Sequence, residues 1–151
     1  MHAIAETLTE TETFLARTTT ARNAGSRARI WSGRVLSTLA ILFLAVDAIG
    51  KLLELTPYVE ATARLGFAPG AVFTLGVIEA ACVALYVIPR TAIVGAVLLT
   101  GWLGGAIATH VRLGSPLATH TLFPIYVAIL IWGGLYLRDA WLRGILAPRR
   151  A

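Results

Sequence analysis

Residues 99–126 read LTGWLGGAIATHVRLGSPLATHTLFPIY, and they join the end of a very apolar segment to a short loop rich in polar side chains. Gly101 and Gly105 form a GxxxG pair, a spacing that lets membrane helices approach closely. The stretch therefore predicts the mouth of a membrane helix bundle. Six polar side chains of the stretch lie between two segments that water would not solvate well: Thr109, His110, Arg112, Thr119, His120 and Thr121.

The composition of the whole chain favours a bilayer as the solvent. Of the 151 residues, 57% are hydrophobic and 14% are charged, against roughly 45–50% and about 25% in ordinary soluble domains. The formal charge of +5 could indicate nucleic acid, but the basic residues lie beside apolar segments, as membrane topology predicts. We therefore expect one membrane domain and no nucleic-acid partner.

Cysteine and histidine usage limits the kinds of site that the chain can form. Cys82 is the one cysteine of the chain, so no internal disulfide and no dithiol redox pair can form. His110 and His120 are ten residues apart with no third ligand at a recognised metal-site spacing. We therefore predict hydrogen-bonding histidines and no metal site, with two metal ligands as the alternative.

Four apolar segments predict an all-α bundle of four transmembrane helices. The first is long enough, at about 1.5 Å per residue, to cross a hydrocarbon core of roughly 30 Å. An amphipathic stretch between the first two segments, about 58–67, predicts a short interfacial helix. A cleaved signal peptide is the rival for the first segment, but Asp47 and Lys51 interrupt its apolar run and no cleavage site follows. The four segments are about 35–55, 71–88, 91–110 and 122–142.

The domain organisation follows from these segments. Residues 34–143 form the predicted four-helix membrane domain, residues 1–33 a disordered or surface-lying basic tail, and residues 144–151 a basic C-terminal tail. If both termini are cytoplasmic, ten of the thirteen basic residues lie on the cytoplasmic side. This bias predicts cytoplasmic termini and a multi-pass protein of the inner, cytoplasmic membrane.

The charged residues of the first two spans fall at one depth. Asp47, Lys51 and Glu54 share one side of the first helix because they are spaced four and then three apart. Counted from the outer surface, Asp47 lies about 12 Å deep and Glu79 about 13 Å deep. Gly76 and Ala80 give the second span a small-residue face for close helix packing, like Gly101 and Gly105 in the third.

These placements predict an outward-opening polar cavity, because charges inside a membrane usually face a bundle interior or water. Two simpler interpretations stay open. Lys51 could extend to the outer headgroups while pairing with Asp47, without further function, and Glu79 could make a purely structural hydrogen bond. Trp102 and the other aromatic residues are predicted packing and interface anchors, although rings near a polar cavity also suit a quinone. The candidate cavity residues are Asp47, Lys51, Glu54, Glu79, His110, Arg112 and His120.

Several motifs resemble the DoxX-like family of small membrane proteins. They are VIPRT at 87–91, TGWLGGAIATHVRLG at 100–114 and THTLFPIY at 119–126, together with DAIGKL at 47–52 and Glu79. The resemblance covers about residues 34–143 and implies a four-helix membrane bundle. The family takes its name from a subunit associated with thiosulfate:quinone oxidoreduction, so the resemblance also implies a redox association.

Three functions follow as hypotheses. The first is a quinone- or redox-associated membrane protein, with quinone as the candidate cofactor. The second is a small-solute or lipid-binding module, or a transporter. The third is a non-catalytic accessory subunit. The sequence assigns no catalytic residue, and the predicted partners are the lipid bilayer, a second copy of the chain or a membrane redox subunit.

Overall fold

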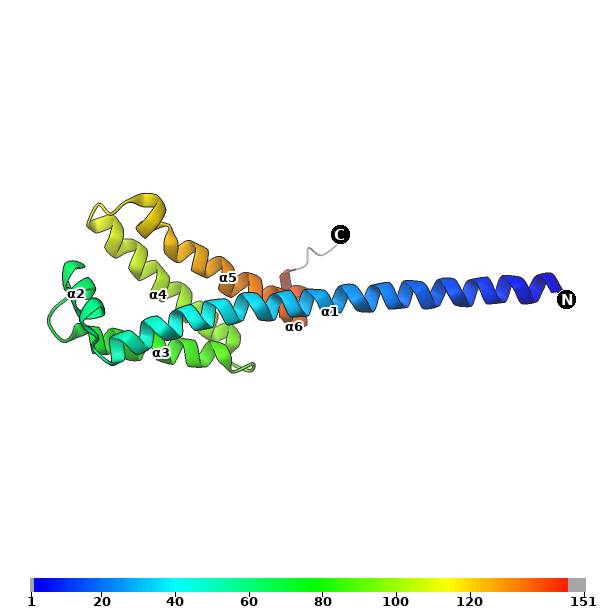
Figure 1. Cartoon of the computed structure of the whole chain (residues 1–151), viewed down its shortest axis with the longest axis horizontal. Helices are drawn as coiled ribbons and strands as arrows, with labels where there is room; N and C mark the ends of the chain where they lie inside the picture. Colours follow the sequence, from blue (N-terminus) through cyan, green and yellow to red (C-terminus); the bar gives the residue numbers. More distant parts are fainter. Residues whose placement is uncertain (1, 147–151) are drawn as a thin grey trace.

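The structure is a computed structural model that describes residues 2–146. Its elements in chain order are α1 (His2–Leu52), α2 (Thr56–Arg64), α3 (Ala71–Val87), α4 (Ala92–Arg112), the π-helical turn η1 (Leu117–Thr121), α5 (Phe123–Arg138) and α6 (Ala140–Leu146) (Figure 1). Over these residues every regular element is helical. The all-α prediction is confirmed.

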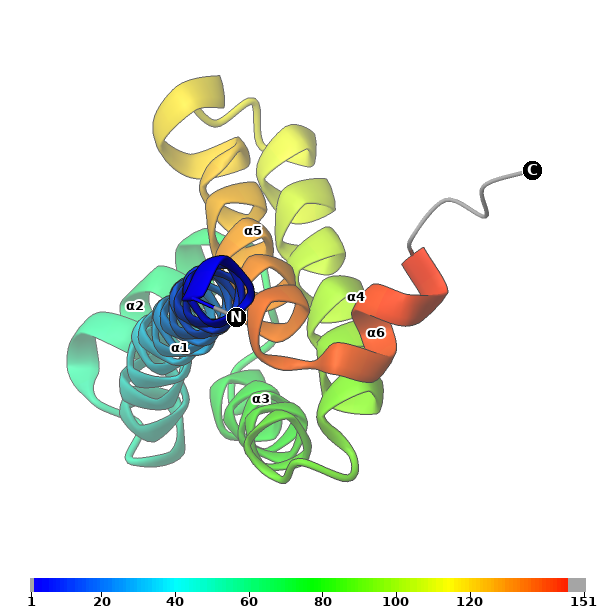
Figure 2. The same ribbon diagram turned by 90° about the vertical axis from the view of Figure 1, so that its right-hand side faces the viewer.

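Four of these helices form the bundle. α1 packs against α3 and α5, and α4 packs against the same two helices from the opposite corner (Figure 2). Within the described chain, α1 is therefore diagonal to α4, and α3 is diagonal to α5. α2 packs against α1 and α3, whereas η1 packs against α4 and α5. Both of these short elements lie at the same end of the bundle, which we call the α2–η1 end (Figure 1).

The bundle belongs to a multi-pass membrane protein. Three stretches are long and apolar enough to cross a membrane: Gly25–Leu52, Ala92–Arg112 and Leu117–Arg138. The second predicted span is the shorter apolar helix α3, with 17 residues. That length is at the lower end of the range of about 17–25 residues for transmembrane helices.

The N-terminal segment is helical in the structure. α1 begins at His2 and extends beyond the bundle as one continuous helix (Figure 1). The segment can continue the first span as a helix because no proline precedes Pro57 and because Ala, Leu, Glu and Arg favour helices. Of the predicted C-terminal tail, residues 144–146 belong to α6, and residues 147–151 lie outside the described residues.

Two helix ends fall earlier than the apolar pattern predicted. The first span ends at Leu52 rather than about Leu55, because Glu54 adopts a left-handed conformation with φ 49°. The Glu54 and Leu55 amides then donate to the carbonyls of Lys51 and Gly50, both at 3.1 Å, which closes the helix C-terminus. Thr56-Pro57 begins α2, where a proline fits the first turn.

The fourth predicted span also ends early, and its remainder forms a separate short helix, α6. α5 ends at Arg138, and the Asp139 side chain accepts hydrogen bonds from the amides of Trp141 at 2.8 Å and Leu142 at 3.1 Å. A carboxylate in this position satisfies amides that have no partner within their own helix. Asp139 therefore begins α6 instead of continuing α5.

The bundle is tightly closed around Tyr86, at the end opposite α2. The Tyr86 hydroxyl donates to the Ile131 carbonyl at 2.8 Å and lies 3.0 Å from the Ser37 hydroxyl, so it joins α3 to α5 and α1. A Cβ at Gly33 would lie only 2.9 Å from the Gly134 carbonyl oxygen. The small residues there let α1 and α5 pack backbone to backbone. Five buried positions of α1 follow the helical repeat toward the bundle interior: Gly33, Ser37, Ala40, Leu44 and Ala48.

Candidate functional site

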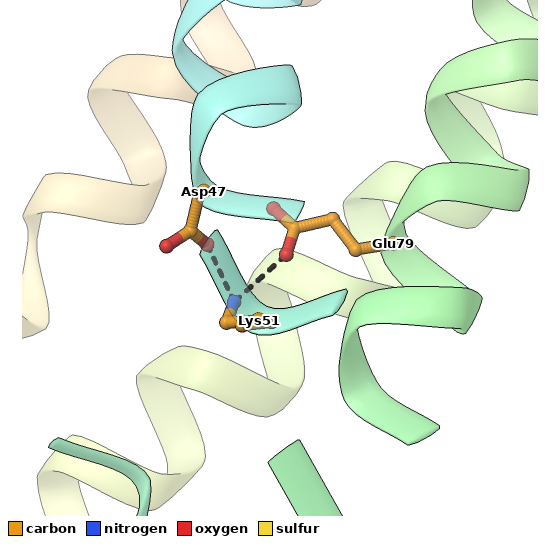
Figure 3. A network of polar contacts seen from close by, with 3 residues as sticks. All are labelled: Asp47, Lys51 and Glu79. Atoms are coloured by element: carbon orange, nitrogen blue, oxygen red, sulfur yellow. Dashed lines mark hydrogen bonds and ion pairs between the residues drawn. The ribbon is translucent and has the colours of Figure 1, made fainter. Parts of the chain in front are cut away.

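An ion-paired cluster of three residues joins α1 to α3. The Lys51 ammonium donates to Asp47 Oδ2 at 2.5 Å and to Glu79 Oε2 at 2.7 Å (Figure 3). We call these three residues the triad. Asp47 precedes Lys51 by one turn of α1, so the ammonium is directed back along the helix toward the bundle interior. Lys51 thus binds both carboxylates.

Gly76 explains how α3 comes close enough for this contact. A Cβ at Gly76 would lie 2.9 Å from Lys51 Cβ and 3.0 Å from the Leu52 amide nitrogen. Glu79 follows three residues later on the same face of α3, so the close approach at Gly76 brings its carboxylate to the ammonium. Ala80, the other small residue predicted on this helix, is half-buried.

The triad borders a cavity of about 630 Å³ at the α2–η1 end. This volume is within the range of about 300–1,000 Å³ that is common for small-molecule sites. Most of the lining is apolar, and one wall holds Phe43 and Phe123 in an edge-to-face contact with ring centroids 5.2 Å apart. Every element except α6 contributes to the lining. Five of the seven predicted cavity residues line it: Asp47, Lys51, Glu79, His110 and His120.

Glu54 and Arg112, the other two candidates, are not among the lining residues. Glu54 is exposed in the turn after α1, where its left-handed backbone carries it away from the face of Asp47 and Lys51. Arg112 is also exposed, and its guanidinium donates to the Leu65 carbonyl at 2.7 Å. Arg112 therefore ties the end of α4 to the segment after α2, beside the cavity.

Exposure falls from one member of the triad to the next. The Asp47 side chain is 31% exposed, that of Lys51 15% and that of Glu79 0%. The Lys51 ammonium also lies 5.2 Å from the centroid of the Trp102 ring, a favourable cation–π distance. Within the described residues, Glu79 Oε1 is buried and has no hydrogen-bond partner. With all three groups ionised, the triad carries a net charge of −1.

The two histidines meet at the α2–η1 end of the cavity. His110 lies in the last turn of α4 and His120 lies in η1, and their ring centroids are 5.7 Å apart. His110 Nδ1 is 3.2 Å from the Ser115 hydroxyl, and His120 Nδ1 is 2.8 Å from the Thr119 hydroxyl. In the described part of the chain, no cluster of three or more His, Cys, Asp or Glu residues could hold a metal.

Gly101 and Gly105 were expected to pack against a neighbouring helix, but within one chain no helix of the described residues lies against them. A Cβ at either position would meet no other heavy atom within 4 Å, and both glycines line the cavity. Within one chain, the absence of side chains at these two positions enlarges the cavity and does not serve helix packing. Gly104 also has open space around it, but it does not line the cavity.

Sequence reasoning missed two contributions to the site. It treated Trp102 mainly as an anchor, whereas the ring stacks with the Lys51 ammonium. It predicted the interfacial helix α2 but not that Tyr58, Ala61 and Thr62 of this helix would line the cavity. The amphipathic pattern of α2 was the available signal, since its less polar face needs a surface to cover.

Fold and site together define an α-helical, multi-pass membrane protein with an ion-paired triad beside a cavity at one end of its bundle. Within that class, the chain belongs to the DoxX-like family, whose model matches residues 35–134. This match includes the whole triad and both histidines. No curated protein and no solved structure gave a significant match to the chain.

Proposed function

We propose that this protein binds a quinone in the cavity and takes part in redox chemistry at the membrane. The observation that carries the proposal is the triad itself, in which Glu79 is fully buried beside a cavity with mainly apolar walls. A charge inside a membrane costs at least about 2.5 kcal/mol, and such charges usually mark functional sites. Family membership supports a redox association.

The lining of the cavity suits a quinone in two respects. The apolar walls, including Phe43, Phe123 and Trp102, can pack against a flat ring and its hydrocarbon tail. The charged and imidazole groups of the lining come from the triad and the histidines, which can hydrogen-bond ring oxygens. The graded exposure of the triad, from Asp47 through Lys51 to Glu79, also supplies groups that can exchange protons with a ligand.

The proposed orientation places the cavity on the outer side of the cytoplasmic membrane and both termini in the cytoplasm. It rests on the basic residues, of which only Lys51, Arg64 and Arg112 would lie on the outer side. We further propose that a membrane redox partner completes the reaction, because one cysteine cannot cycle between a dithiol and a disulfide. A second copy of the chain is the alternative partner.

The test is mass spectrometry of the lipids extracted from the gently purified protein. We expect the parent to retain a stoichiometric quinone and Glu79→Gln to lose it, because the variant removes the charge that holds Lys51 in place. Glu60→Gln is the matched control, since Glu60 is exposed and pairs only with Arg64, at 2.9 Å. Retention in the control but not in Glu79→Gln supports the site. An empty parent would overturn the proposal.

A second candidate function is the binding of a lipid or another small apolar solute without redox chemistry. The observation that favours it is the predominance of apolar residues in the cavity lining. The same extraction distinguishes the two functions, because a stoichiometric phospholipid or fatty acid in place of quinone identifies a lipid-binding protein. If the cavity is empty while Glu79→Gln folds as well as the parent, the accessory-subunit function is favoured.

A further inference from the structure

The histidine pair has a feature that the proposed function does not use. Each ring is held at Nδ1 by a hydroxyl of its own segment: His110 by Ser115 and His120 by Thr119. Both histidines line the cavity, and across the described residues neither Nε2 atom has a hydrogen-bond partner. Two ring nitrogens are thus left for a ligand.

The hydroxyl partners allow the tautomer in which Nε2 carries the proton. A serine or threonine hydroxyl can donate to an unprotonated Nδ1, and a neutral imidazole then carries its proton on Nε2. In this tautomer both histidines are Nε2–H donors. In that state the pair offers two donors to one kind of ligand atom, a hydrogen-bond acceptor.

The distance between the rings allows both donors to bind one atom. With an N–H···O distance of about 2.9 Å, an accepting oxygen lies about 4 Å from the centroid of each ring. The observed centroid separation of 5.7 Å then corresponds to an angle of about 90° at the oxygen, within the broad range that sp² oxygens accept. A metal is less suited to this pair because zinc sites in proteins use three or four protein ligands.

We propose that His110 and His120 together bind one carbonyl oxygen of the ligand and so fix the direction in which its ring enters the cavity. The proposal rests on the proposed function and specifies it: one quinone oxygen lies between the two Nε2–H groups, and the other lies deeper in the cavity. The two carbonyls of a bound quinone are therefore inequivalent. His110 and His120 are binding residues, and Ser115 and Thr119 are positioning residues.

The first test is infrared spectroscopy of the purified protein loaded with an unlabelled short-chain benzoquinone, and a sample that carries ¹³C at one carbonyl serves only to assign the two bands. Hydrogen bonding weakens a carbonyl bond, so we expect two separated C=O stretches in the parent, the lower one from the oxygen between the histidines. The separation should shrink in His110→Leu and in His120→Leu. Equal stretches in a protein that does bind the quinone would overturn this inference and leave the proposed function intact.

Affinities for the same benzoquinone give the second test. Loss of one hydrogen bond should weaken binding about tenfold in each leucine variant. His110→Gln and His120→Gln keep an N–H donor near the Nε2 position and should bind within about threefold of the parent. If the glutamine variants bind as poorly as the leucine variants, the rings act only by packing and the inference is wrong.

The positioning residues provide the third test. Ser115→Ala and Thr119→Val should each weaken binding and narrow the separation of the two carbonyl stretches, because the ring is then free to turn or to move its proton. Ser32→Ala is the matched hydroxyl control, since Ser32 is exposed and donates only to the Ala28 carbonyl. No change in either positioning variant would contradict their role. A parent that binds no quinone would overturn both this inference and the proposed function.

Discussion

At the residue scale, Lys51 stabilises the triad because its one ammonium is shared by two carboxylates. A buried ion pair gains little over well-packed apolar groups, but removing one partner leaves an uncompensated charge. In this protein, removal of the cation would leave two carboxylates together beside the cavity, with Glu79 fully buried. The triad is therefore best tested by removing Lys51 alone and then all of its charges at once.

We expect Lys51→Met to lower the free energy of unfolding by about 3 kcal/mol, as is typical when a buried charge loses its partner. The triple variant Lys51→Met, Asp47→Asn, Glu79→Gln should lose less, because no charge is left alone. Denaturation by SDS from mixed micelles measures both. Arg64→Met is the control: it breaks an exposed pair, and such pairs contribute about 0–1 kcal/mol. A smaller loss in Lys51→Met than in the triple variant would contradict the shared-cation model.

Glu54 allows a second prediction at this scale. Its left-handed backbone, with φ 49°, costs a residue with a side chain about 1–2 kcal/mol, a cost that glycine avoids. Glu54→Gly should therefore raise the free energy of unfolding by about 1 kcal/mol. Because Glu54 does not line the cavity, quinone retention should be unchanged. Loss of quinone from this variant would show that Glu54 contributes to binding after all.

At the scale of the elements, Gly76 of α3 has a different role from Gly101 and Gly105 of α4. Gly76 has the backbone of α1 against it, whereas Gly101 and Gly105 leave space in the cavity. Both pairs show the same small-xxx-small spacing in the sequence. The spacing predicts a face of the helix without bulky side chains. Only the fold shows whether another helix packs against that face or a cavity lies beside it.

Gly101→Leu should therefore abolish quinone retention and leave the fold intact, because the new side chain would occupy the cavity. We expect at least a tenfold loss of retained quinone and a thermal midpoint close to that of the parent. Gly104→Leu is the matched control on the same helix: it adds the same side chain outside the cavity and should retain quinone. If Gly101→Leu retained a full complement of quinone, the ligand would have to bind elsewhere.

Hydropathy and helix periodicity predicted most of the elements. The apolar segments became α1, α3, α4 and α5, because burial in a bilayer requires long runs of apolar residues whatever their neighbours are. The common depth of Asp47 and Glu79 was predictable by counting residues from the helix ends. Local hydrogen bonds set the helix ends at Glu54 and Asp139, and apolar content does not encode these bonds.

The contact between Lys51 and Glu79 could not be predicted in the same way. The two residues are 28 positions apart, and their pairing depends on the close packing at Gly76. The cation–π contact of Lys51 with Trp102 likewise needs α4 to lie across the bundle from α1. Sequence identified the polar residues of the site, but the packing of three helices determined which of them touch.

For the whole molecule, the proposed orientation can be tested with cysteine labelling. Ala63 is exposed on α2, and Arg90 is exposed in the turn between α3 and α4, near opposite ends of the bundle. In a Cys82→Ala background, a membrane-impermeant maleimide should label Ala63→Cys in intact cells and leave Arg90→Cys unlabelled until the cells are lysed. The reverse pattern would place the cavity on the cytoplasmic side and overturn the orientation.

The tight packing around Tyr86 also limits what the molecule can do. In the described chain, neither Tyr86 nor Ser37, Gly33 or Gly134 lines the cavity, and backbone contacts between α1 and α5 close that end. The cavity is therefore not continuous with the Tyr86 end of the bundle. Conduction across the bilayer would first require Gly33 and Gly134 to separate.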